Sequence, residues 1–288
     1  MNLHNPHRTR PWRWHATGSP ANMPLPLNFL IAHLAHAVPK NIFYNRSNNG
    51  YHHMTELNHY LQRHFLNEAQ LTRAGAISIG ELNALIHDRL VPAPSYVVTD
   101  AGNLCSFVFG EMAAPGATPG RYFPPSQLIW IDRARHAIAC DATEDAEVRL
   151  KSQFTTNFAT ALATLNLSTW RLRDSFDDRG AAIDDGLLAR TDAAWEHFLN
   201  GTFGLCVANA MSEAHIAYKE VLQEKLTQTS DNGRQTKFSA QLAQSTSELI
   251  DAYAAAAMPF SPIEYASSSR KRLVEDLREN IHRSAVAA

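Results

Sequence analysis

The stretch SIGELNALIHDRLVPAP, residues 78–94, decides the local fold in the first half of the chain. Ser78 and Glu81 have the spacing of a capping box, in which the serine hydroxyl accepts from a backbone amide three residues on and the glutamate side chain reaches back. Apolar residues then recur on one face of a helix, and the prolines end it because they cannot continue the hydrogen-bond ladder. We therefore predict a helix that begins after Ser78 and stops before Pro92.

Together with the residues on both sides, this helix forms a predicted module over residues 54–100. Apolar spacing predicts a first helix before it, and Asn67 is typical of the start of a second, short helix that ends at Gly75. Residues 95–99 predict a strand. This series of helix, turn, helix and strand resembles the winged helix-turn-helix of mercury-resistance-type transcription regulators. The first helix carries Leu57, Tyr60, Leu61 and Phe65.

The resemblance to those regulators implies that the second helix enters the major groove of DNA, where Asn83 and His87 would make the contacts. The charge of the module opposes this reading, because residues 54–100 carry three basic and five acidic residues. Phosphate neutralisation supplies most of the affinity for DNA. The charge therefore argues against nucleic acid as a partner, and DNA binding remains the alternative interpretation.

The composition indicates a globular protein. The chain has 288 residues, of which 45% are hydrophobic and 19% are charged. That is enough apolar material for a real core and too little charge for a disordered protein, so we expect one large or two modest domains. The 26 basic and 28 acidic residues nearly balance, which argues against a strongly basic nucleic-acid binder.

The cysteines and glycines point to no metal and no cofactor. Cys105, Cys140 and Cys206 are too few for a disulfide framework and lack the close spacing of a zinc site, so we expect a reducing, cytoplasmic location. The glycines around the loop at residues 114–125 lack phosphate-loop spacing. No apolar run of about 18 residues follows the first 53 residues, so we expect no membrane partner.

Residues 1–53 differ sharply in composition from the rest. They contain five basic residues, seven of the fourteen histidines and no Asp or Glu, which leaves 21 basic and 28 acidic residues to the remainder. Prolines interrupt the segment and no period is sustained, so we interpret it as a disordered or spurious extension that ends before Met54. A faint likeness to a signal or transit peptide is opposed by the histidines and prolines.

The remaining residues predict a small antiparallel sheet in residues 101–140 and a helical bundle in residues 141–288. Strands at Asn103–Met112 and Gln127–Ile131 would form this sheet together with the strand at residues 95–99. The predicted fold is thus mainly α, with a minor α+β part. Five helices are expected in residues 141–288: one capped at Asp141 that runs through Leu165, and four at residues 187–199, 212–226, 236–257 and 268–282.

No motif identifies a reaction, and the catalytic residues stay unknown. Acidic residues gather in the loop at residues 174–185 without the ligand spacing or central glycine of a calcium loop, so we interpret it as solvated. Cys206 has histidines nearby in sequence, and a cysteine beside a histidine can form a nucleophilic site, but no third residue that would orient the histidine can be named. We therefore favour a buried thiol. The titratable and aromatic residues gathered there are Trp195, His197, Cys206, Glu213, His215 and Lys219.

The string YASSSRKR, residues 265–272, is the most distinctive candidate for ligand binding. Hydroxyls at the start of a helix, followed by cations, place free backbone N–H groups beside positive side chains, which suits an anion. An ion pair with neighbouring acids is the structural alternative. The residues predicted to bind a small anionic ligand are Ser267, Ser268, Ser269 and Arg270.

Four strings together resemble an uncharacterised bacterial family associated with natural-product biosynthesis gene clusters. They are Phe65–Leu71, Leu90–Tyr96, Phe198–Cys206 and Ser267–Arg270. The resemblance covers residues 54–288 and implies an accessory or tailoring protein in specialised metabolism, with no catalytic residue to carry over. The alternatives are a ligand-sensing transcriptional regulator and a protein-interaction scaffold. The oligomeric state stays open.

Overall fold

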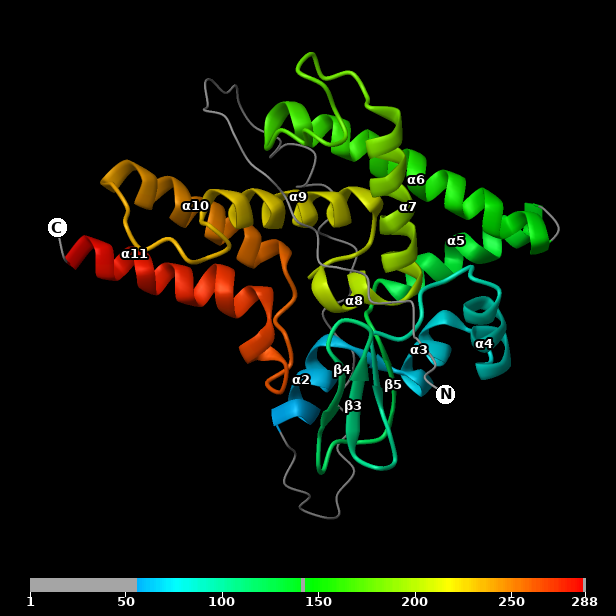
Figure 1. The fold of residues 1–288 in the computed structure, drawn as a ribbon. Helices are drawn as coiled ribbons and strands as arrows, with labels where there is room; N and C mark the ends of the chain where they lie inside the picture. The colour runs from blue at the N-terminus through cyan, green and yellow to red at the C-terminus, as the bar shows by residue number, and fades with distance from the viewer. Residues whose placement is uncertain (1–55, 141–142, 287–288) are drawn as a thin grey trace, which may run out of the picture. The chain divides into compact units, whose positions relative to one another are not determined.

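The computed structural model describes residues 56–140 and 143–286, so the expectations for residues 1–53 lie outside the part described. The protein is mainly helical with one small antiparallel sheet (Figure 1). The helices are α2 Glu56–His64, α3 Glu68–Gly75, α4 Ile79–His87, α5 Gln127–Cys140, α6 Thr143–Ser168, α7 Asp184–Leu199, α8 Thr202–Cys206, α9 Glu213–Thr229, α10 Ala240–Ala256 and α11 Leu277–Val286, with a 3-10 turn η1 Tyr265–Ser267 and a π-helical segment η2 Lys271–Asp276.

The sheet has five antiparallel strands in the order β1-β5-β2-β3-β4. Its central pair places Tyr96 opposite Tyr122 and Val98 opposite Gly120, and these tyrosines are buried. The strand predicted at Asn103–Met112 is in fact a hairpin, β3 and β4. The strands are β1 Leu66–Asn67, β2 Tyr96–Val98, β3 Asn103–Ser106, β4 Gly110–Ala113 and β5 Gly120–Phe123.

Side-chain caps start the two short helices as the sequence predicts. Asn67 Oδ1 accepts from Gln70 N at 2.9 Å, and Asn67 N donates to Gln70 Oε1 at 2.9 Å, which is a complete capping box. Ser78 Oγ accepts from Glu81 N at 3.0 Å. The Glu81 carboxylate does not reach back, because it pairs with Arg135 of α5 instead.

The strand predicted at Gln127–Ile131 is wrong, because these residues open helix α5. A short apolar run does not distinguish a strand from a buried helix. The residues that follow decide the matter: Trp130 and Ile131 are buried together with Ala134 and Ala137, which is helical spacing. In sequence, helix α5 follows the last strand of the sheet and precedes the remaining helices.

The largest hydrophobic cluster joins all three predicted segments of the chain. It includes Leu82 of α4, Trp130 of α5 and Phe154 of α6, so the boundaries predicted near residues 100 and 140 do not separate independent cores. A second cluster lies between α2 and the sheet, and a third lies among α9, α10, η2 and α11. Figure 1 shows α10 and α11 on one side of α9, with α5, α6 and α7 on the other.

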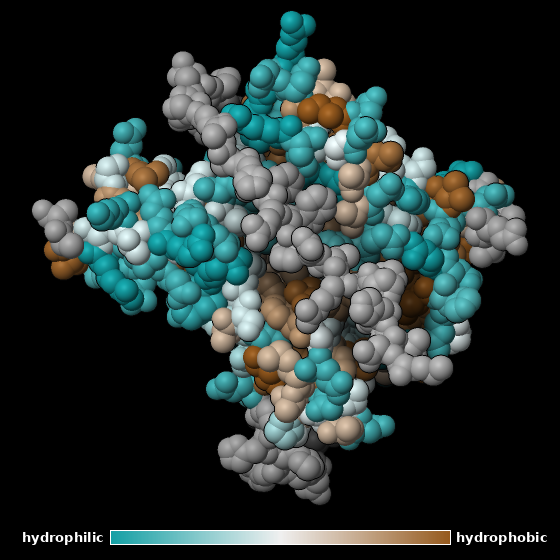
Figure 2. Space-filling view, viewed as in Figure 1, coloured by the Kyte–Doolittle hydropathy of each residue, from teal (hydrophilic) through white to brown (hydrophobic). Residues whose placement is uncertain are grey.

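The expected last helix is confirmed, although it is not regular. Helical residues run from Ser269 to Val286, and six of them, Lys271–Asp276, form the π-helical segment η2. In the view of Figure 2, hydrophilic side chains cover α10 and α11, whereas apolar side chains show near α8 and the strands. Across the described residues, no helix combines the length and apolar character needed to cross a membrane.

Candidate functional site

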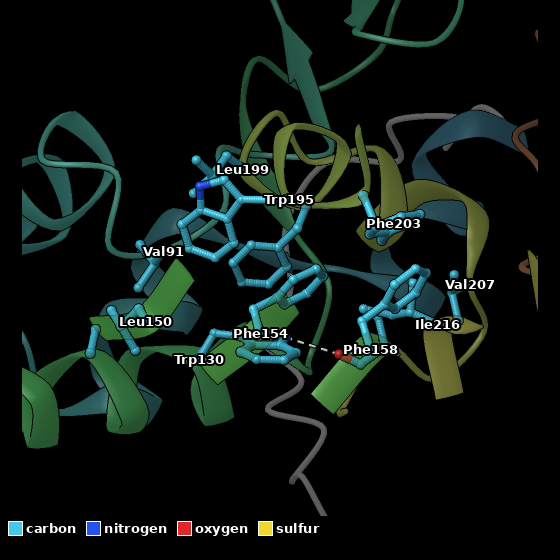
Figure 3. Packing of buried hydrophobic residues seen from close by; sticks show 14 of the residues in the cluster. Val91, Trp130, Leu150, Phe154, Phe158, Trp195, Leu199, Phe203, Val207 and Ile216 are labelled. Atoms are coloured by element: carbon cyan, nitrogen blue, oxygen red, sulfur yellow. Dashed lines mark hydrogen bonds between the residues drawn. The ribbon is translucent and has the colours of Figure 1, made fainter. Parts of the chain in front are cut away.

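The buried rings of Trp130, Phe154 and Trp195 pack in one hydrophobic cluster (Figure 3). Together with the ring of Phe198 they line a cleft between α5, α6 and α7. The ring centroids of Trp130 and Phe198 lie 4.6 Å apart, those of Phe154 and Phe198 4.9 Å, and those of Trp195 and Phe198 5.3 Å. These rings therefore contact one another as a single wall. The cleft, called here the aromatic cleft, is lined by Leu90, Trp130, Arg133, Leu150, Gln153, Phe154, Trp195, Phe198 and Glu213.

Helical spacing brings these side chains to one place. Trp195 and Phe198 are three residues apart on α7, and Trp130 and Arg133 are three apart on α5, so each pair shares a helix face. The cleft measures about 280 Å³ when the space open to solvent is counted, and the enclosed space within it has room for about one water molecule.

A polar group closes one side of the cleft. Arg133 Nη1 donates to Glu213 Oε1 at 2.9 Å, and Asn157 Nδ2 donates to the same oxygen at 3.2 Å. The Arg133 guanidinium also lies over the Trp130 ring, 4.4 Å from its centroid, which is a cation–π contact. Glu213 is buried, whereas 36% of the Arg133 side chain is exposed, so the cation is reachable from solvent.

Among the residues that line the cleft, Trp195 carries a buried polar group without a partner, its indole N–H. Trp195 is 1% exposed, and its Nε1 has no hydrogen-bond acceptor among the residues that the structure describes. A buried donor without a partner costs about 1–3 kcal/mol. The neighbouring Trp130 shows the contrast, because its Nε1 donates to Ala210 O at 2.9 Å. The cleft therefore suits a ligand atom that accepts a hydrogen bond.

The titratable residues singled out in the sequence divide between two places. Glu213 joins the aromatic cleft, whereas Cys206 and Lys219 lie in a separate cluster with Glu220. Burial raises the pKa of the Cys206 thiol to about 11. Burial lowers the pKa of Lys219, but the Glu220 carboxylate 2.8 Å away, together with Tyr253 and Cys206, outweighs that effect, so the pKa of Lys219 is raised. Neither group is therefore a nucleophile near neutral pH.

His197 and His215 do not complete a nucleophilic site at Cys206. His215 Nδ1 lies 3.0 Å from Ser212 Oγ at the start of α9, and burial lowers the pKa of His215. The ring of His197 packs against Phe203, with the centroids 6.0 Å apart. Cys206 is half-buried rather than fully buried as expected, and the contacts of these two histidines are made with Ser212 and Phe203.

A buried carboxylate joins the loop after α10 to the sheet. Glu264 is 1% exposed and accepts from three hydroxyls: Tyr96 at 2.6 Å, Ser261 at 2.8 Å and Ser106 at 2.9 Å. Burial raises the pKa of Glu264, although the three hydroxyl donors oppose that shift. The cluster connects β2, β3 and the segment before η1, which is a structural role that needs no ligand.

We expect a pH-dependent difference in stability between wild type and Glu264→Gln. A carboxyl whose pKa is raised by folding stabilises the fold below its unfolded pKa and loses that contribution as the pH rises through its folded pKa. The wild type should therefore gain stability relative to the variant as the pH falls from about 7 to about 5. Urea denaturation at several pH values measures this difference. Parallel curves for the two proteins would contradict the assignment.

The residues predicted to bind an anion are used by the fold itself. Ser268 Oγ accepts from Lys271 N at 3.0 Å, and Ser269 Oγ accepts from Tyr253 OH at 2.8 Å. Arg270 Nη1 donates to two backbone carbonyls at the end of α10, those of Ala254 at 2.8 Å and Ala257 at 2.9 Å. Ser267 is exposed. These contacts favour a structural role for the string, and anion binding stays a prediction.

The residues of the DNA-binding interpretation lie on the exposed face of α4. Asn83 Oδ1 accepts from Arg121 Nη2 at 2.7 Å, and His87 Nδ1 lies 2.9 Å from Asp88 Oδ1. Asn83 therefore already has a partner within the chain. DNA binding by these two residues stays a prediction.

Two carboxylates of the acidic loop at residues 174–185 form hydrogen bonds with other residues of the protein. Asp174 receives two-point contact from Arg190 at 2.7 and 2.8 Å, and Asp177 Oδ1 accepts from the backbone N–H of Arg179 and Ala181 at 2.8 Å. In the part of the chain described, no group of three His, Cys, Asp or Glu side chains could hold a metal ion. The three cysteines are unpaired.

Comparison with known proteins adds one likeness. Residues 150–282 match a family of unknown function (DUF6058), and no curated protein or solved structure matches the chain. The matched segment includes the cleft residues of α6, α7 and α9, while Trp130 and Arg133 of α5 precede it. The match is consistent with an uncharacterised family and carries no link to a pathway or to a regulator.

Proposed function

We propose that this chain is an accessory or tailoring protein of a specialised-metabolite pathway and that it binds a small molecule in the aromatic cleft. The resemblance of its four strings supports the pathway. The observation that carries the binding site is the buried, unpartnered N–H of Trp195 in a cleft lined by aromatic rings. Apolar walls with a few polar groups are typical of small-molecule sites.

The lining of the cleft defines the chemistry of the ligand. The rings of Phe154 and Phe198 favour a planar apolar body. Trp195 Nε1 requires a hydrogen-bond acceptor, and the exposed part of Arg133 favours a negative charge on the outer part of the ligand. The proposed ligand is thus an aromatic or conjugated molecule that carries a carboxylate, sulfonate or similar acceptor.

The fluorescent probe 8-anilinonaphthalene-1-sulfonate has this chemistry and tests the site. We expect saturable binding by the full chain, weakened about tenfold in Trp195→Phe, because a lost hydrogen bond to a charged acceptor is worth about 1.5–3 kcal/mol. The matched control is Trp170→Phe, since Trp170 donates to Glu224 outside the cleft. Equal affinity in wild type and both variants would show that the probe does not use the cleft.

A second experiment separates the pathway protein from the regulator. Deletion of the gene should remove or alter a specialised metabolite, and the wild-type gene and the Asn83→Ala/His87→Ala variant should restore it equally. A regulator acting through α4 would instead leave the variant inactive and lower the transcripts of neighbouring genes. Metabolite profiles and transcript levels, measured on the same cultures, distinguish these outcomes.

A further inference from the structure

A second cavity lies on the other side of the aromatic wall. It shares Trp130 and Phe198 with the aromatic cleft, so these two rings separate the two spaces. The second cavity measures about 250 Å³ when the space open to solvent is counted, and its enclosed space again has room for about one water molecule. Its other lining residues include Ser95, Gln127, Gly201 and Gly204.

Gln127 gives the second cavity an acceptor without a partner. Its side-chain Nε2 donates to Pro92 O at 2.7 Å, which settles the orientation of the amide, because a flipped oxygen would face that carbonyl. Oε1 is then left without a donor among the residues described, and Gln127 is 0% exposed. The two cavities therefore offer complementary groups: an unpaired donor on Trp195 and an unpaired acceptor on Gln127.

The two rings of the shared wall are not held equally. Trp130 is fixed by the hydrogen bond from its Nε1 to Ala210 O, at 2.9 Å. Phe198 has no polar atom in its side chain and is held by ring contacts alone. Because each enclosed space fits one water molecule, a larger ligand requires one ring to turn, and Phe198 is the ring that turns at lower cost.

We propose that the ligand site continues past Phe198 into the second cavity and that the inner end of the ligand is a neutral hydrogen-bond donor, a hydroxyl or a primary amide, paired with Gln127 Oε1. This inference rests on the proposed function. The donor is neutral because the described residues that line the second cavity include no acidic side chain to balance an ammonium. The site thus selects a ligand by both ends.

Two probes that differ in a single donor test this inference. We use 2-phenylethanol and its methyl ether, which have the same aromatic body. The wild type should bind the alcohol about tenfold more tightly, because the ether leaves Gln127 Oε1 unpaired. In Gln127→Met the preference should disappear. The matched control is Gln244→Met, the same change on the exposed surface of α10 outside both cavities, which should keep the preference.

The wild-type comparison decides the inference even if Gln127→Met does not fold. Equal binding of alcohol and ether, or binding of neither, overturns it and indicates that the second cavity holds only water. The proposed function then stands if the anilinonaphthalene probe still depends on Trp195. Loss of that dependence removes the proposed function as well, so the two failures are distinguishable.

Discussion

The Glu220→Leu variant is expected to lose about 3–5 kcal/mol of stability, because it leaves the buried ammonium of Lys219 without a counter-charge. Lys219 is 2% exposed, and its Nζ contacts Glu220 Oε1 at 2.8 Å and Gln223 Oε1 at 2.6 Å. Once Glu220 is removed, the amide oxygen of Gln223 is the hydrogen-bond partner left to the ammonium among the described residues. Thermal or chemical denaturation measures the loss.

The sign of the pH dependence distinguishes a lost ion pair from a packing defect. In the variant, burial acts alone and lowers the pKa of Lys219, so the unfolded state binds more protons than the folded state. Raising the pH from about 7 to about 9 should therefore reduce the difference in free energy of unfolding between Glu220→Leu and wild type. The double variant Lys219→Met/Glu220→Leu should recover most of the loss. A double variant as unstable as the single one would contradict the assignment.

Local signals predicted the helices well wherever a cap marked their start. Asn67, Ser78 and Ser212 each accept a backbone hydrogen bond at the first turn of a helix. These residues act over three positions, so their effect can be read from neighbours in the chain. Helix α5 was missed because Gln127 offers no such cap and its apolar run suits either structure.

The aromatic cleft could not be predicted, because its residues come from distant parts of the chain. Trp130 and Glu213 are 83 positions apart and meet because α5 and α9 both pack against α6. Taken singly in the sequence, each aromatic residue looks like an ordinary buried core residue. The informative property is a missing partner, the unpaired N–H of Trp195, and no sequence pattern reports which donors a fold leaves unpaired.

Three of the four strings that carry the family resemblance are in contact with one another in the fold. Phe65 packs on Tyr96 with ring centroids 5.1 Å apart, and Ala93 N donates to Leu199 O at 2.8 Å. The end of α8 meets the residues after α10 through the hydrogen bond from Met258 N to Cys206 O, 3.0 Å long. These three strings therefore mark packing contacts around α8 and the sheet, which explains why they contain few exposed polar side chains.

The Gly186→Ala variant is expected to lose about 3 kcal/mol or more of its free energy of unfolding, because there is no space for a methyl group at this position. An added Cβ would lie 1.7 Å from the backbone oxygen of Asp174. The loop cannot simply move away, since the Asp174 carboxylate is held by Arg190, one turn further along α7. Relief of the overlap therefore requires loss of that ion pair or displacement of α7.

Gly80 provides the matched control for Gly186, because it is also a glycine in the first turn of a helix. The nearest atom to a Cβ at Gly80 is Ser78 Oγ, 3.8 Å away, so the methyl group fits. Gly80→Ala should stabilise the protein by up to about 1 kcal/mol, through the higher helix propensity of alanine. Melting temperatures of the two variants should thus move in opposite directions. A Gly186→Ala protein as stable as wild type would show that the loop at Asp174 is not held against α7.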